Sequence, residues 1–254
     1  MKIAVLVKIL PDDQDIQVKE DRTLDFSRAK STVSTYDLNA IEAAAQLAAK
    51  ADAQLVAVTC GPKSINDSKT RKNILSRGVD ELYMLADDGL ELADAYQTGR
   101  ILAAMVQKIG DVDLVIAGDG SADLYAQQVD IQTAEALGWP AINGGTALDT
   151  DGATVTVTRI LETERETVRM PLPAVVSVAP EVALPRIAGM KDVLAAGKKP
   201  VVEFTADELG GIAAPTVETV EILAPVPTPR KKQIFDAADE GAIDAFVAAL
   251  REVI

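Results

Sequence analysis

The stretch VDLVIAGDGSADLYAQQV, residues 112–129, decides the fold. It opens on a mostly apolar run that predicts a buried strand over 112–118, and it leads into a helical pattern expected to span 123–138. A strand, a turn of small residues and a helix in this order often hold a phosphate, because backbone N–H groups and the helix N-terminus face the anion. The turn has neither the lysine of a triphosphate loop nor the GxGxxG of a dinucleotide loop.

Strand and helix patterns alternate through the first 140 residues. Continuous apolar runs predict strands, and apolar residues at helical spacing predict helices. The expected strands are 2–9, 53–60, 81–85 and 112–118, and the expected helices are 37–50, 64–78, 94–110 and 123–138. Asp37 is expected to be the N-cap of the first helix, and Gly78 to follow the end of the second. The alternation predicts an α/β fold, with a Rossmann-like, doubly wound and mostly parallel sheet.

The loops that follow the strands are the expected place for a ligand, because such sheets bind ligands at the carboxyl ends of their strands. Three of these loops lie near Lys8-Ile9, Cys60-Gly61 and Gly118-Asp119. We therefore expect them to meet in one crevice, with residues 112–129 at its edge.

The pattern changes after residue 141. Alternating residues predict a β-hairpin near 153–170, followed by an apolar strand over 173–179 and by a loop with a short helix over 180–201. Residues 206–235 are rich in Gly and Pro, and an amphipathic helix over about 237–253 carries apolar Ile243, Phe246, Leu250 and Ile254. We expect a nucleotide-binding domain over 1–205 and a C-terminal arm over 206–254. The arm either folds back on its own domain or, as we favour, contacts a partner.

The composition excludes several classes of function. A formal net charge of −14 argues against nucleic-acid binding, which needs a basic surface. The absence of histidine removes the commonest general base and metal ligand, so no metal site is expected. Cys60 is the single cysteine, which excludes an internal disulfide and favours a reducing cytoplasm. No apolar run reaches the roughly 18 residues of a membrane span. Catalysis by Asp, Lys or Tyr stays open, but the composition favours binding.

Seven ordered segments cover most of the chain: LVK, AIEAAAQL, AVTCGP, ILSRGVDELY, VDLVIAGDGSADLYAQQV, LPAVVSV and LPRIAGMKDVLAAGKKPV. Together they resemble the β subunit of electron-transfer flavoproteins, and FSRAK, YDLNAIEAA and SADLYAQQV resemble its FixA-like branch. The resemblance implies a heterodimer whose α subunit holds most of the electron-carrying FAD. It also implies an adenine nucleotide in the β subunit. That nucleotide is AMP in ordinary members, and in electron-bifurcating members it is a second FAD that takes a hydride from NADH.

The resemblance implies particular residues for the nucleotide. Gly118 and Gly120 let backbone N–H groups approach the phosphate, and Ser121 offers its hydroxyl group. Asp123, expected in the first helical turn, serves as a cap or binds the ribose hydroxyls, and Tyr36 covers the adenine or packs in the core. The matched residues are Leu6, Ser34, Thr35, Tyr36, Asp37, Cys60, Gly118, Asp119, Gly120, Ser121, Ala122, Asp123, Leu124, Tyr125, Gln127, Gln128 and Val129. The alternative is an ordinary strand–helix turn with solvent-facing glutamines.

A second site is implied in the loop near 182–197, where a partner dehydrogenase or reductase, often of the acyl-CoA dehydrogenase type, docks. The matched residues are Pro185, Arg186, Ile187 and Met190. Met190 corresponds to the anchoring side chain of the family, and Lys198 and Lys199 resemble a lysine-rich run that steers acidic partners. The alternative is that Ile187 and Met190 pack under the short helix.

Two departures from the family pattern bear on the cofactors. Pro11-Asp12-Asp13 stand where many members carry an aromatic residue that leans on the partner's flavin. Val129 stands where many members carry a threonine in the nucleotide loop. AMP and a non-catalytic carrier role are favoured, and a bifurcating subunit with its own FAD is the alternative. Cys60 is expected to be a packed residue rather than a reactive thiol.

Overall fold

The computed structural model describes residues 1–253, which fall into two compact units. Unit 1 comprises residues 1–17 and 25–221, and unit 2 comprises residues 18–24 and the chain from 222 onward. Ile254, expected on the last helix, lies outside the described residues. No helix within residues 1–253 is long and apolar enough to cross a membrane.

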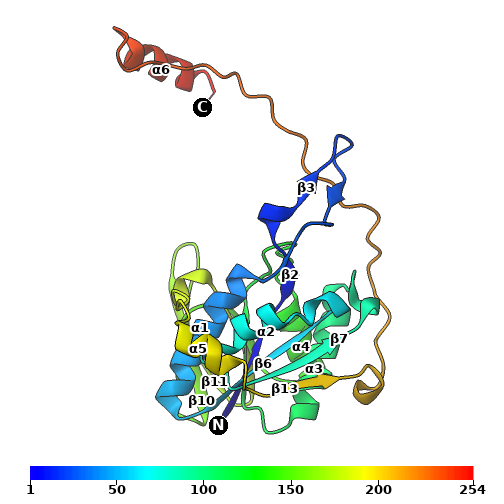
Figure 1. Ribbon diagram of the computed structural model, residues 1–254. Coiled ribbons are helices and arrows are strands. Elements are labelled where there is room, and N and C mark those ends of the chain that lie inside the picture. Colours follow the sequence, from blue (N-terminus) through cyan, green and yellow to red (C-terminus); the bar gives the residue numbers. More distant parts are fainter. Residues whose placement is uncertain (254) are drawn as a thin grey trace. The chain divides into compact units, whose positions relative to one another are not determined.

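Unit 1 is organised around a nine-stranded sheet (Figure 1). Its strands are β1 (Lys2–Leu6), β6 (Gln54–Gly61), β7 (Glu81–Ala86), β8 (Leu114–Gly118), β9 (Ala141–Thr150), β10 (Thr154–Ile160), β11 (Arg165–Pro171), β12 (Ala174–Val178) and β13 (Val201–Phe204). Their order in space is β11-β10-β9-β12-β8-β1-β6-β7-β13. Within the described chain its pairings are parallel, except the two that β10 makes with β9 and β11. The predicted Rossmann-like, mostly parallel α/β fold is confirmed.

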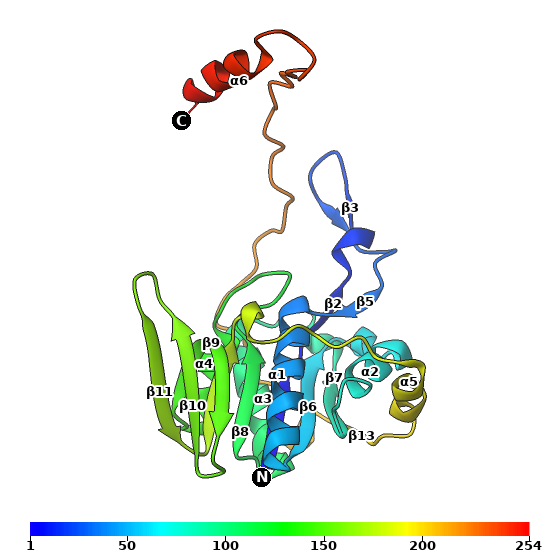
Figure 2. The same cartoon turned by 90° about the vertical axis from the view of Figure 1, so that its left-hand side faces the viewer.

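Helices cover both faces of this sheet (Figure 2). α1 (Thr35–Ala51), α2 (Ser68–Leu75) and α5 (Met190–Ala196) belong to one apolar cluster, and α3 (Ala95–Ile109) and α4 (Val129–Leu137) belong to the other. Side chains alternate along β1, where Ile3 and Val5 join the first cluster and Ala4 and Leu6 the second. The central strands are continuously apolar because both of their faces are buried.

The winding of the sheet reverses at β1. From β1 the chain moves to β6 and β7 on one side, and it later places β8 on the other side of β1. The carboxyl ends of β1 and β8 are Leu6 and Gly118, so the loops after these residues border the crevice at the reversal. Open α/β sheets bind ligands at such a switch point.

The helices next to the predicted site, α1 and α4, begin at residues other than those predicted. α1 begins at Thr35, so Asp37 lies in its first turn and is not the N-cap, a position that Ser34 takes. α4 begins at Val129 rather than at residue 123. Tyr125 and Gln127 have positive φ angles of 45° and 55°, which interrupt a right-handed helix before that point. Asp123 therefore lies in a separate turn of the loop, closed by the hydrogen bond from Tyr125 N to Ser121 O at 3.0 Å, and not in the first turn of α4.

Several elements are not predicted by the sequence pattern. They include β9, β13, an antiparallel pair of β2 (Ile9–Pro11) with β5 (Ser31–Val33), and a pair of β3 (Gln17–Val18) with β4 (Leu24–Asp25). The short 3-10 helices are η1 (Asp13–Asp15), η2 (Lys63–Ile65), η3 (Asp88–Leu90), η4 (Pro180–Val182) and η5 (Asp207–Leu209). The helix expected over 64–78 is divided between η2 and α2, and α2 ends at Leu75, with Ser76 as its C-cap, rather than at Gly78.

Unit 2 contains the last helix, α6 (Ala242–Arg251), shorter than the expected 237–253. The side chains of Ile243, Phe246 and Leu250 on α6 are 75%, 49% and 41% exposed. The ring of Phe246 meets that of Phe235 edge to face, with the centroids 5.7 Å apart. Described by itself, unit 2 thus leaves an apolar helix face uncovered.

Candidate functional site

The loops after β1 and β8 meet the first turn of α1. Lys8 N donates a hydrogen bond to Asp37 Oδ2 at 2.7 Å, and Ala122 N donates to Ser34 Oγ at 3.3 Å. Ser34 is fully buried, and Leu6 ends β1 just before these contacts. Three predicted segments that are far apart in the sequence therefore come together at the switch point of the sheet.

Asp37 is buried against Gly118. A Cβ atom on Gly118 would lie 2.7 Å from Asp37 Oδ1 and 3.0 Å from the backbone of Tyr36, so this approach requires glycine. Burial raises the pKa of Asp37 to about 7, although hydrogen bonds from the backbone of Lys8 and Gly118 oppose the rise. The crevice therefore contains a carboxyl group that changes its charge near neutral pH.

An aromatic side chain of the loop after β8 lies over Gly120. A Cβ atom on Gly120 would lie 2.3 Å from the ring of Tyr125. The Tyr125 hydroxyl donates to Asp119 Oδ2 at 3.0 Å, and its ring packs 4.9 Å from the ring of Tyr36, tilted by 38°. Desolvation and the bond to Asp119 raise the pKa of Tyr125 to about 12. Glycine at 120 thus accommodates the protein's own tyrosine in this arrangement of the loop.

Asp123 is the centre of a small polar cluster. Its Oδ2 accepts from Lys8 Nζ at 2.6 Å, and its Oδ1 accepts from Ser121 Oγ at 2.5 Å. Desolvation raises the pKa of Asp123, but the bonds from Lys8 and Ser121 together lower it below the ordinary value. Lys8 is not among the matched nucleotide residues. The sequence nevertheless points to it in two ways, because Lys8 ends the segment LVK and belongs to a loop expected at the carboxyl edge of the sheet.

Other predicted nucleotide residues are more exposed. Leu124 has 68% of its surface exposed, and Gln127 and Gln128 face solvent. Val129 is the first residue of α4, and Thr35 is exposed at the start of α1. These side chains do not take part in the hydrogen bonds that join the loop after β1, the loop after β8 and the start of α1.

Cys60 lies near the end of β6, on the far side of β1 from β8. It is half-buried, and burial raises the pKa of its thiol to about 12. The thiol is therefore protonated at neutral pH and is a poor nucleophile. Among residues 1–253, no group of Cys, Asp and Glu side chains is arranged to hold a metal ion.

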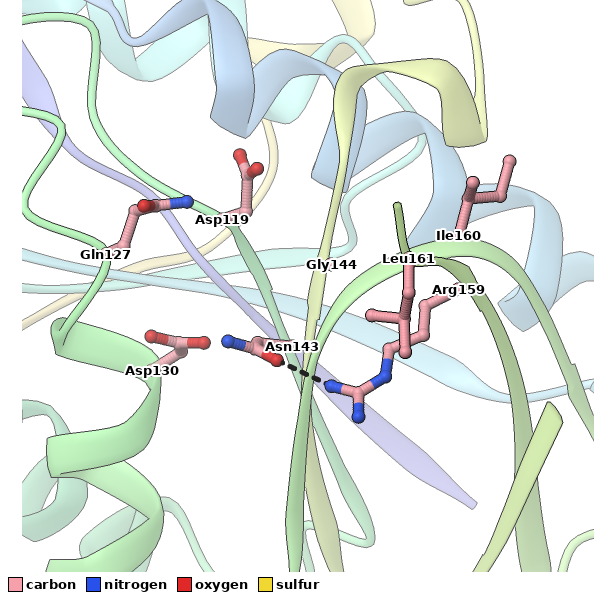
Figure 3. A pocket seen from close by; sticks show the side chains of 8 residues that line it. All are labelled: Asp119, Gln127, Asp130, Asn143, Gly144, Arg159, Ile160 and Leu161. Atoms are coloured by element: carbon pink, nitrogen blue, oxygen red, sulfur yellow. Dashed lines mark hydrogen bonds between the residues drawn. The ribbon is translucent and has the colours of Figure 1, made fainter. Parts of the chain in front are cut away.

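A small open pocket of about 130 Å³ lies beside the loop that follows β8 (Figure 3). Its lining residues come from the loop, α4, β9 and the β10 end of the hairpin: Asp119, Gln127, Asp130, Asn143, Gly144, Arg159, Ile160 and Leu161. Arg159 Nη1 donates to Asn143 Oδ1 at 2.9 Å, and Asp119 Oδ1 is buried without a partner among the described residues. Typical small-molecule sites measure roughly 300–1,000 Å³. A whole nucleotide therefore does not fit inside this pocket.

Comparison with protein families matches residues 22–209 to the electron transfer flavoprotein domain. The chain belongs to the electron transfer flavoprotein family. The matched range includes the start of α1, the loop after β8 and the loop before α5. Membership in this family indicates that the chain takes part in electron transport. FAD is the cofactor that the family suggests, and other flavoprotein subunits and redox enzymes are the partners that it suggests.

The loop before α5 in this electron transfer flavoprotein is clamped onto α1. Arg186 Nε and Nη2 donate to the two carboxylate oxygens of Glu42 at 2.6 and 3.1 Å, and Arg77 donates to the carbonyl of Arg186. Asn39 donates to two carbonyls of the loop at 3.0 and 2.8 Å. Pro185 is half-buried next to this clamp. The guanidinium group of Arg186 therefore holds the loop in place.

Beyond the clamp, the loop presents apolar side chains to solvent. Leu184 is 89% exposed, Ile187 97% and Met190 77%. The alternative in which Ile187 and Met190 pack under the short helix is therefore wrong. Lys199 Nζ donates at 2.9 and 2.5 Å to two backbone carbonyls at and beyond the end of α2, whereas Lys198 is exposed. Of the predicted lysine pair, Lys198 is the side chain that faces solvent.

Proposed function

We propose that the chain is the β subunit of a heterodimeric electron transfer flavoprotein of the FixA-like branch, and that it binds an adenine nucleotide, AMP, at the switch point of its sheet. The α subunit would hold the electron-carrying FAD. The family match supports the electron-transfer role. One structural observation supports the nucleotide site: the loop after β1 and the loop after β8 both donate hydrogen bonds to the N-terminus of α1, the first to Asp37 and the second to the N-cap Ser34.

The residues around the crevice fit an adenylate. The Lys8 ammonium, the Ser121 hydroxyl and the amides of the loop are donors suited to a phosphate. Tyr36 and Tyr125 offer aromatic faces to a base. These groups now contact Asp123 and one another, so nucleotide binding would include a rearrangement of residues 119–128.

Counting the nucleotides of the heterodimer tests this proposal. The chain would be purified with its α subunit, and the cofactors released in acid and quantified. We expect one FAD and one AMP per heterodimer. Two FAD, together with bleaching of the flavin by NADH, would instead identify an electron-bifurcating subunit, and a stable chain with no nucleotide and no α partner would contradict both functions.

The proposal includes a surface for the redox partner. The loop before α5 presents an apolar prong, by which we mean the exposed side chains of Leu184, Ile187 and Met190. The ion pair between Arg186 and Glu42 holds the base of this loop. A fixed base and apolar side chains suit a docking contact with a dehydrogenase or reductase, of which the acyl-CoA dehydrogenase type is the favoured class. In this role the chain supports electron transfer without performing bond chemistry itself.

A further inference from the structure

We propose that Lys8 binds the phosphate of the nucleotide, and that Asp123 is an internal anion that occupies Lys8 until the phosphate displaces it. The inference rests on the proposed nucleotide site. It adds to that site a binding residue outside the set predicted from the sequence, and a side chain that limits its affinity.

Lys8 lies where the predicted nucleotide segments meet. Its backbone N–H is held by Asp37 Oδ2 at 2.7 Å, and its side chain reaches the loop after β8, where Nζ contacts Asp123. Burial raises the pKa of Asp37 and of Cys60, and the positive charge of Lys8 opposes both rises; at Asp123 the hydrogen bond and the charge of Lys8 help to lower the pKa. An anion bound between these segments would therefore lie close to the Lys8 ammonium.

The carboxylate of Asp123 takes the donors that a phosphate would use. It accepts from Lys8 Nζ at 2.6 Å and from Ser121 Oγ at 2.5 Å, one donor for each of its oxygens. Charged oxygens of carboxylates and phosphates are bound by the same ammonium and hydroxyl groups. Lys8 and Asp123 are 115 residues apart, so the pair joins two sides of the crevice rather than stabilising one turn. Asp123 thus occupies the position of an acidic ligand.

The pair is weak enough to be displaced. The side chains of Lys8 and Asp123 are 41% and 35% exposed, and ion pairs in contact with water add little to stability. A phosphate has more charge and more acceptor oxygens than a carboxylate, so it competes well for the same donors. It must also overcome repulsion from the Asp123 carboxylate, which therefore lowers the affinity for the nucleotide.

The other role considered for Asp123, binding the ribose hydroxyls, makes the opposite prediction. A residue that binds ribose adds affinity for AMP and for adenosine alike, so its loss weakens both. An internal anion competes only with the phosphate, so its loss strengthens AMP binding and leaves adenosine binding unchanged.

Calorimetric titration of the nucleotide-free heterodimer with AMP and with adenosine tests the inference. Asp123→Asn is expected to bind AMP about five-fold more tightly. Lys8→Met is expected to bind AMP about ten-fold more weakly, because a charge-assisted hydrogen bond is lost. Neither variant should change the affinity for adenosine. The double variant should bind AMP more tightly than Lys8→Met, because the Asp123 carboxylate also repels the phosphate and occupies the Ser121 hydroxyl.

Asp149→Asn is the matched control, because Asp149 forms a similar exposed ion pair with Lys50, at 2.7 Å, and its loss changes the net charge equally. Its AMP affinity should equal that of the unaltered protein. Weaker binding of both ligands by Asp123→Asn, or unchanged AMP binding, would overturn the inference while the nucleotide site stands. Failure of the unaltered protein and of all variants to bind AMP would overturn the site itself.

Discussion

Asp37 makes the stability of the fold depend on pH. Its pKa of about 7 in the folded chain exceeds the ordinary value of 3.8 because the carboxyl group is buried. The folded chain therefore holds this proton more tightly than the unfolded chain does. The stability that Asp37 contributes is complete at low pH and is lost as the pH rises from about 4 through about 7.

Asp37→Asn should remove this part of the pH dependence, since the amide stays neutral. We expect the free energy of unfolding of the variant to fall less than that of the unaltered chain between about pH 5 and about pH 8. Urea denaturation at several pH values measures the difference. Equal slopes for the two proteins would show that Asp37 does not titrate in this range.

Single residues also show what the sequence could predict of the site. The pattern predicts Asp37 at the start of a helix and Gly118 at the end of a strand, and the structure places them in α1 and β8, where a Cβ atom on Gly118 would lie 2.7 Å from Asp37 Oδ1. Their role in binding a nucleotide stays a prediction. The role of Asp123 was expected to be local, as a helix cap or a ribose ligand. Its actual partner, Lys8, is 115 residues away, and no spacing rule links such positions.

The loop before α5 depends on one ion pair at its base. The Glu42 side chain is 8% exposed, so Arg186→Met would leave a nearly buried carboxylate without its cation. We expect the free energy of unfolding to fall by about 1–2 kcal/mol. Arg165→Met, on the exposed strand β11, is the control and should leave the stability unchanged.

The apolar prong of the same loop should matter for partners and not for folding. Ile187→Ser and Met190→Ala should each slow electron exchange with the partner dehydrogenase or reductase, because exposed apolar side chains of this kind anchor docking. Stability and bound nucleotide should stay as they are. Ile160→Ser is the control, since Ile160 is 61% exposed on the hairpin. Undiminished exchange in the Ile187 and Met190 variants would remove the loop from the docking site.

Helices and strands whose apolar residues recur at a regular spacing could be predicted from the sequence. Elements that depend on contacts with distant parts of the chain could not. β1, β6 and β8 are mostly apolar because helices cover both faces of the sheet. β9 carries Asn143-Gly144-Gly145, which weakens any strand pattern, and its pairing with β12 shifts register between Val176 and Val178. The neighbouring strands, and not its own sequence, make it a strand.

At the scale of the whole molecule, we expect the exposed apolar face of α6 to contact the α subunit. Phe246→Ser should reduce the fraction of the chain that copurifies with the α subunit, because Phe246 is part of the exposed apolar face of α6. The nucleotide site lies in unit 1 and should be unaffected. Asp244→Asn, on the same helix, is the control. Unchanged copurification of the Phe246 variant would exclude this face from the subunit contact.

The two outermost strands of the sheet influence how the protein behaves when it is concentrated. β13 has four residues, and β11 presents Arg165, Glu166 and Arg169 along its length. Edge strands that are short or charged disfavour pairing with the edge strands of other molecules, which is how open sheets form fibres. We therefore expect the edges of this sheet not to pair with further copies of the chain, so that the protein stays dispersed when it is concentrated.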